Sequence, residues 1–238
     1  MTAVSPELIR FAASRNASPP LHLGTRYNET GSFLAEPGNT VVCHLAGGSA
    51  TERALAAARE KYLAMPEAGD LIFTPLSSLH MTLFQGIIEY RRKPGFWPAD
   101  VSLETPIEEM TEIMGERLAG FPVAAPFGVA VTATRPTGLV VEGATADDRA
   151  AMQAWRDAFA ELWGYRHPDH ESYVFHVTFA YPVRWLDDTA LPAWQAMLDE
   201  VAATLRAEVP VLELRPPAFC AFNDMNHFEE LLALPVAG

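Results

Sequence analysis

Short runs of apolar residues are separated along this chain by longer stretches in which apolar residues recur at a helical spacing. Period-two alternation and short continuous apolar runs indicate strands. Such runs lie at residues 41–46, 71–74, 79–84, 127–132, 139–142, 175–180, 209–214 and 219–222. Helical spacing with start and stop signals predicts helices at residues 49–65, 106–118, 146–163 and 192–206, and a short helix at 6–14. The order strand, helix, strand, helix therefore occurs twice.

Two of the predicted strands contain the same short motif. Residues 79–84 read Leu-His-Met-Thr-Leu-Phe, and residues 175–180 read Phe-His-Val-Thr-Phe-Ala. Successive side chains of a strand point to opposite faces, so His80 and Thr82 share one face. His176 and Thr178 share a face in the same way, and apolar residues form the back of both strands. Each motif therefore presents an imidazole and a hydroxyl side by side.

The spacing of the motifs predicts how the chain is organised. The two motif histidines are 96 positions apart, which suits one motif in each half of a duplicated fold. No segment rich in Gly and Ser separates the halves, so we expect them to be lobes of a single domain at residues 41–238. Residues 1–40 contain several Pro and Gly residues and little periodicity, and are expected to form an N-terminal arm.

Composition narrows the class of protein. The chain is 49% apolar and 20% charged, which is ordinary for a globular protein, and its formal net charge is −13. This acidity argues against a long nucleic acid as partner, whereas a small anionic ligand in a local pocket remains compatible. We see neither a signal-peptide pattern nor an apolar run long enough to span a membrane. A cytoplasmic protein without disulfides is expected, with Cys43 and Cys220 as buried free thiols.

Two imidazoles facing one cleft are suited to displacement at phosphorus. One can take a proton from the attacking oxygen while the other gives a proton to the leaving oxygen, and each transfer typically contributes about 10²–10⁴-fold in rate. An unperturbed imidazole titrates near pH 6.5, so a pair can share one proton at neutral pH. The hydroxyls of Thr82 and Thr178 can donate hydrogen bonds to phosphate oxygens. This arrangement requires neither a metal nor a cofactor.

The two motifs, their apolar flanks and their placement in successive halves resemble the two-histidine (2H) phosphoesterase superfamily, which includes the RNA ligase and cyclic nucleotide phosphodiesterase proteins of the LigT type. The resemblance spans roughly residues 41–225, and the arm is closer to an uncharacterised bacterial branch. It implies a bilobal, duplicated α+β fold in which antiparallel sheets form a central cleft with helices on the outside. It also implies metal-independent action on a cyclic phosphate or a 2′-5′ phosphodiester of a nucleotide or RNA end. His80 and His176 would be acid and base, and Thr82 and Thr178 phosphate donors.

One position departs from the family pattern. Some relatives have a basic residue five positions after the motif histidine, where this chain has Gln85 and Tyr181. Arg91, in the dense basic cluster at residues 90–95, or Arg26 would have to supply that contact. The candidate substrate-binding residues are Arg26, Tyr27, Asn39, Arg91 and Tyr181.

Two other functions are compatible with the sequence. A nucleotide-binding module could keep the same pocket without turnover, although binding alone would not need both imidazoles. A metal hydrolase would use the cluster from His167 to His170, but Pro168 breaks the helix that would align the two histidines. The sequence leaves open which motif histidine is the base, which substrate is used and in which direction the reaction runs. A monomer is expected.

Overall fold

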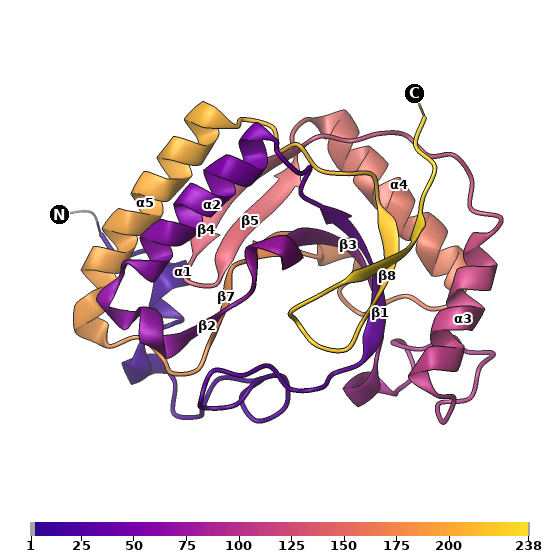
Figure 1. Ribbon diagram of the computed structural model, residues 1–238, viewed down its shortest axis with the longest axis horizontal. Helices are drawn as coiled ribbons and strands as arrows, with labels where there is room; N and C mark the ends of the chain where they lie inside the picture. The colour runs from indigo at the N-terminus through magenta and orange to yellow at the C-terminus, as the bar shows by residue number, and fades with distance from the viewer. Residues whose placement is uncertain (1–2, 238) are drawn as a thin grey trace.

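Figure 1 shows the computed structural model of the chain, which describes residues 3–237. Its helices are α1 (Pro6–Ile9), α2 (Ala50–Leu63), α3 (Ile107–Leu118), α4 (Ala146–Trp163) and α5 (Leu191–Glu208). Its strands are β1 (Gly38–His44), β2 (Leu71–Phe73), β3 (His80–Ile88), β4 (Val129–Arg135), β5 (Gly138–Gly143), β6 (His176–Thr178), β7 (Ala180–Pro182), β8 (Ala218–Phe222) and β9 (Glu229–Ala233). Within this part of the chain, none of the helices has the length and apolar character that crossing a membrane requires.

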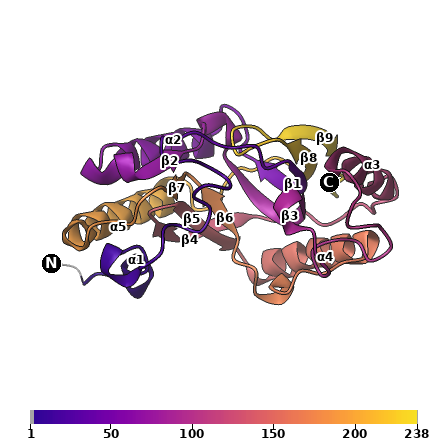
Figure 2. The same ribbon diagram turned by 90° about the horizontal axis from the view of Figure 1, so that it is seen from below.

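Most strands belong to one antiparallel sheet. Its order is β4-β5-β6-β3-β1-β8-β9, while β2 and β7 form a separate antiparallel pair. Helix α4 packs against β3 and β5, α3 lies beside it against β1 and β3, and α5 packs against β4 with α2 alongside. Figure 2 shows these helices on the outside, with α2 and α5 in one lobe and α3 and α4 in the other. The predicted α+β fold with antiparallel sheets and outer helices is confirmed.

Helix α4 shows how local sequence sets these elements. The Thr145 hydroxyl accepts a hydrogen bond from Asp148 N (3.1 Å) while the Asp148 carboxylate accepts one from Thr145 N (2.9 Å), a capping box that starts the helix. Gly164 ends it in the left-handed conformation, at a φ of 73°. The ring of Phe159, fully buried, packs 5.7 Å from that of Phe84 on β3. The predicted bounds of this helix are confirmed, and it supports the apolar back of the first motif strand.

The second motif strand is shorter than its sequence predicts. Strand β6 ends at Thr178, and the chain passes through the buried Phe179 into β7, which pairs with β2 instead of the large sheet. The backbone N–H of Phe179 donates to the Thr137 carbonyl (2.9 Å), and its carbonyl accepts a hydrogen bond from Thr74 N (2.9 Å). These bonds turn the chain out of the sheet immediately after the motif.

Two predictions for the C-terminal part were wrong. Residues 209–214 form no strand, because the segment crosses from Val129, where β4 begins, to Leu45, just beyond β1, and makes a single bridge to each. Strand β9 was not predicted, because all five of its residues are exposed and its sequence lacks the alternation of a half-buried strand.

The N-terminal residues pack against the rest of the molecule. The helix predicted at 6–14 is reduced to α1 and a separate 3₁₀ turn, because Ala13 N leaves the helix to donate to the Leu186 carbonyl (2.8 Å). The ring of Tyr27 is buried, and its hydroxyl donates to a backbone carbonyl of β7 (2.9 Å). Strand β1 already begins at Gly38, within the residues assigned to the arm.

Gly138 allows the β4–β5 turn to lie against the second motif. A Cβ there would be 2.2 Å from the carbonyl oxygen of Val177, and its φ is 133°. We expect Gly138→Ala to displace β6 and to lower the free energy of unfolding by about 3 kcal/mol or more, since backbone strain and overlap with backbone atoms act together. Urea denaturation measures this loss.

Gly24→Ala is the matched control. Gly24 also has a positive φ, 84°, but nothing lies within 4 Å of an added Cβ. Its replacement should cost only the conformational strain, about 1–2 kcal/mol. Equal losses in the two variants would contradict the close approach of the turn to β6.

Candidate active site

A single cross-strand pair joins the two motif strands. Met81 of β3 lies opposite Val177 of β6, and these are the middle residues of the two His-x-Thr motifs. Because the strands are antiparallel, this register sets each motif histidine beside the threonine of the other motif, with His80 and His176 on a diagonal. Side chains on such a diagonal lie roughly 7–8 Å apart, which leaves room for a phosphate between two imidazoles.

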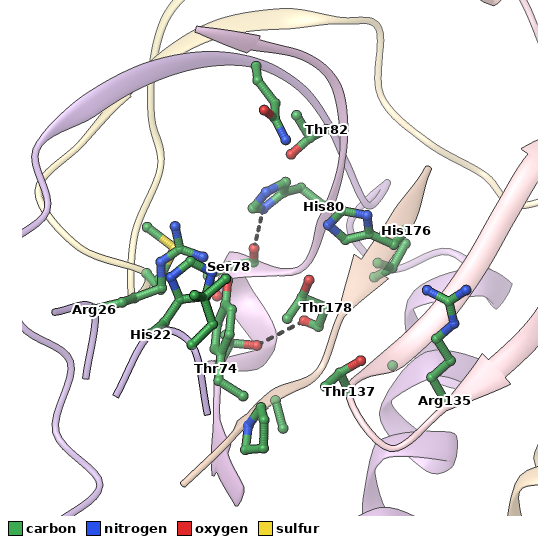
Figure 3. Close-up of a pocket in the computed structure, with 18 of the residues that line it drawn as sticks. His22, Arg26, Thr74, Ser78, His80, Thr82, Arg135, Thr137, His176 and Thr178 are labelled. Atoms are coloured by element: carbon green, nitrogen blue, oxygen red, sulfur yellow. Dashed lines mark hydrogen bonds between the residues drawn. The ribbon is translucent and has the colours of Figure 1, made fainter. Parts of the chain in front are cut away.

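A cleft of about 640 Å³ opens in front of this pair. The motif histidines and threonines line it, together with residues of the N-terminal arm, the β4–β5 turn and the loop between β8 and β9. Figure 3 shows His80 and His176 near its centre, with Arg26 and Arg135 on opposite sides. The structure therefore brings together the four motif residues that the sequence pattern singles out.

His80 lies behind an aromatic ring. Its Nδ1–H donates to the Ser78 carbonyl (2.6 Å), which leaves Nε2 as the nitrogen available to the cleft. The ring centroid of Phe228 is 4.1 Å from that of His80, and the ring of His44 on the adjacent strand is 6.1 Å away. Burial lowers the pKa of His80 to about 4, because the imidazolium form loses hydration. His80 is therefore neutral at pH 7 and able to accept a proton.

His176 makes the same backbone bond in a more open setting. Its Nδ1–H donates to the Val174 carbonyl (3.0 Å), and its side chain is exposed to the cleft. Desolvation by the cleft walls lowers the pKa of His176; the bond to Val174 opposes this change, and the charges of Arg135 and Arg26 add to it. Both imidazoles thus hold the same orientation in different surroundings.

Two further threonines hold the second motif in place. The Thr74 hydroxyl donates to the carbonyl of Thr178 (3.1 Å), a bond drawn in Figure 3. The Thr137 carbonyl accepts the N–H groups of Phe179 (2.9 Å) and Ala180 (3.2 Å). The position of the Thr178 side chain therefore depends on residues from β2 and the β4–β5 turn.

Positive charge lines the cleft although the whole chain is acidic. Glu7 pairs with Arg10 (3.7 Å) and with Arg135 (3.1 Å), and Glu36 makes a bidentate pair with Arg26 through Nε and Nη2 (3.2 Å for Nη2). The arginines that line the cleft are Arg10, Arg26, Arg91 and Arg135. Such a lining suits an anionic ligand.

The other sequence-predicted residues divide into two groups. Asn39 is fully buried, and its side-chain amide accepts from a backbone N–H of β3 (3.0 Å) and donates to the Thr111 hydroxyl (3.1 Å). Tyr27 is bonded to β7, and burial raises its pKa to about 12. Both therefore support the cleft wall. Tyr181 lines the cleft with the guanidinium of Arg26 5.4 Å from its ring centroid, and Arg91 lines it as well.

Several cleft residues were not identified from the sequence. Arg135 and Thr137 belong to a predicted hairpin turn, and the proximity of that turn to the motif strand depends on pairing that a sequence alone does not reveal. His22 lies in the arm beside Arg26, and burial followed by that positive charge lowers its pKa. The missed residues are His22, Thr74, Ser78, Arg135, Thr137, Tyr173 and Phe228.

The histidines of the proposed metal cluster face different partners. His167 Nε2 bonds to a backbone carbonyl of β3 (2.9 Å), whereas His170 Nε2 bonds to Asp157 (2.9 Å). Among the residues that the structure describes, one group has the spacing of metal ligands, namely Asp157, His170 and Glu171. Arg166 already pairs with both of its carboxylates (2.9 and 2.7 Å). These contacts give the metal-hydrolase hypothesis no support.

The chain is similar to one family and to two solved structures. Residues 26–140 match the family described as 2H-phosphodiest, domain of unknown function (DUF1868). A conserved protein of unknown function from Agrobacterium tumefaciens str. C58, ATU0111, is 52% identical, with 97% of this chain and 99% of that chain covered and a TM-score of 0.95. TT0787 of Thermus thermophilus is 15% identical, with 84% of this chain and 99% of that chain covered and a TM-score of 0.45. No curated protein matches the chain.

The stacking of Phe228 on His80 predicts the titration of this imidazole. We expect the NMR titration of His80 to give a pKa near 4, and Phe228→Ala to raise it toward 6.5, because water then reaches the ring. Phe222→Ala is the control, since Phe222 belongs to the same apolar cluster but contacts Phe228 (5.1 Å). An unchanged His80 pKa in Phe228→Ala would show that Phe228 does not desolvate it.

Proposed function

Because the chain belongs to the two-histidine (2H) phosphoesterase superfamily, we propose that it is a metal-independent phosphodiesterase. Its substrate is a cyclic phosphate or a 2′-5′ phosphodiester of a nucleotide or RNA end. The observation that supports this most directly is the register of Met81 and Val177, which sets two imidazoles on one diagonal of an arginine-lined cleft. Acid and base then stand on either side of a phosphate.

The surroundings of the histidines divide the proton transfers between them. His80, neutral because burial lowers its pKa to about 4, takes a proton from the attacking water through Nε2. The water oxygen bonds to phosphorus as the bond from phosphorus to the ester oxygen breaks. His176, open to the cleft, donates the Nε2 proton of its imidazolium form to that leaving oxygen. Exchange with solvent then restores the initial protonation of both rings.

The rest of the cleft stabilises the charge on phosphate. The hydroxyls of Thr82 and Thr178 donate to the non-bridging oxygens, and the loss of one such preset donor typically costs on the order of 10²–10³-fold in turnover. Arg26 and Arg135 add positive charge on opposite sides of the imidazoles. Since imidazoles supply both acid and base, no step requires a metal.

Removal of either motif histidine tests this mechanism. We expect the wild type to hydrolyse nucleoside 2′,3′-cyclic phosphates or ADP-ribose 1″,2″-cyclic phosphate in EDTA. His80→Ala and His176→Ala should each lower kcat by about 10²–10⁴-fold, because each removes one proton transfer. Product formation resolved by chromatography provides the measurement.

His227→Ala is the matched control, since this exposed histidine is adjacent to Phe228 and does not line the cleft. It should retain wild-type turnover. Full activity in both motif variants would exclude the His/His mechanism. Tight binding of these nucleotides by the wild type without any turnover would instead favour a non-catalytic nucleotide-binding module.

The lowered histidine pKa values predict an acidic optimum. Turnover needs one neutral and one protonated imidazole, so kcat/KM should follow a bell-shaped curve with its maximum below pH 6.5. Activity falls at higher pH as His176 loses its proton, and at lower pH as His80 becomes protonated near pH 4. Enzyme incubated at each pH and assayed again at the optimum controls for denaturation. A maximum above pH 7 would be inconsistent with these protonation states.

A further inference from the structure

Arg91 differs from the other arginines of the cleft. Within residues 3–237 no carboxylate lies at ion-pair distance from it, whereas Glu7 or Glu36 pairs with each of the others. Its Nη1 donates to Gln85 Oε1 (2.9 Å), and its guanidinium lies 4.9 Å from the ring centroid of Phe96. Its Nε and Nη2 are buried and have no hydrogen-bond partner in this part of the chain. One neutral amide therefore holds a cation in the wall of the cleft.

A bulge in β3 brings Gln85 to the cleft. Thr82 and Phe84 lie opposite Val42 and Val41, which are consecutive residues of β1, so β3 carries one extra residue at this point. Strict alternation from Thr82 would turn Gln85 toward the core, because the two are an odd number of positions apart. The bulge reverses this parity, and Gln85 lines the cleft on the same face as Thr82.

The register also gives the distance of Gln85 from the reaction centre. Gln85 lies opposite Thr40, two residues along β1 from the partner of Thr82. Two strand positions correspond to about 7 Å. The contact between Gln85 and Arg91 therefore lies roughly one nucleoside length from the phosphate that the motif residues would hold.

The surroundings of Arg91 suit an anion. Tyr173 lines the same cleft, and its hydroxyl is buried without a hydrogen-bond partner among the described residues. Burial lowers the pKa of Arg91, and the positive charge of Arg26 also contributes to the decrease. A buried guanidinium with unused donors is costly unless an acceptor completes its hydrogen bonds. A negatively charged oxygen is a stronger acceptor than the neutral amide that Arg91 now contacts.

We propose that Arg91 binds a second, non-reacting phosphate of the substrate. This inference rests on the proposed function and narrows its substrate class to nucleotides with a cyclic or 2′-5′-linked phosphate at one end and another phosphate across the same nucleoside. The 3′ end of an oligonucleotide and a 5′-phosphorylated nucleoside 2′,3′-cyclic phosphate both meet this description. The second phosphate displaces Gln85 Oε1 from Nη1 and draws the guanidinium toward the cleft, where Nε or Nη2 also donates to it.

Binding of two ligands that differ by one phosphate tests this subsite. Adenosine 2′,3′-cyclic phosphate, with and without a 5′-phosphate, is titrated by calorimetry into His176→Ala, which prevents turnover. We expect the 5′-phosphate to strengthen binding by about 10- to 100-fold, as charge-assisted hydrogen bonds do, and Arg91→Ala in this background to abolish that gain. Arg91→Lys should keep part of it, because it retains the charge but not the planar fork.

Lys93→Ala is the matched control, since Lys93 is an exposed cation of the same segment and lies over the same Phe96 ring (4.8 Å). It should keep the full gain. The proposal is wrong if the 5′-phosphate brings no gain, if Arg91→Ala weakens both ligands equally, or if neither ligand binds. Turnover of the unphosphorylated compound by the wild type tests the proposed function separately, so a phosphate-specific gain without turnover would leave the subsite standing and reject the catalytic role.

Discussion

The pairing of Met81 with Val177 is the contact on which the rest of the site depends. It is the one residue pair that links β3 to β6 in the large sheet, and both side chains are fully buried. A shift of one residue in this register would move one motif's imidazole and hydroxyl from the cleft to the core. Helix α4 fixes β3 from behind, while Gly138 and Thr74 fix β6 from the other side. Much of the fold thus serves to hold two short strands in a single register.

Local patterns were sufficient to predict the motif faces and the main helices. Alternation in each motif strand places His80 with Thr82, and capping residues bound α4, because these features depend on neighbours in sequence. The direction of Gln85 depends on a bulge set by pairing with β1, and the strand break at Phe179 depends on bonds to two distant segments. The contact of Phe228 with His80 joins residues 148 positions apart. Such features follow from tertiary pairing, which the sequence of one strand does not contain.

Net charge describes the whole surface of this protein but not its cleft. The chain carries a formal charge of −13, yet its cleft is lined by four arginines. Glu7 and Glu36 pair with three of them and so fix their guanidinium groups while cancelling part of their charge. An acidic exterior disfavours long polyanions, and a local group of cations still accepts a small one. The predicted absence of a long nucleic acid partner and the proposed phosphate ligand are therefore compatible.

The two motifs are nearly symmetric, so the difference between acid and base must come from outside them. Each imidazole donates Nδ1–H to the carbonyl two residues before it, and neither motif alone distinguishes the two roles. The β8–β9 loop places Phe228 over His80 and excludes water from that ring, while the β4–β5 turn places Arg135 near His176. An apolar ring favours a neutral imidazole over an imidazolium. His176 keeps contact with the open cleft, where an anionic phosphate would stabilise its protonated form. A symmetric pair of strands thereby becomes an ordered pair of base and acid through two elements that carry no recognisable motif.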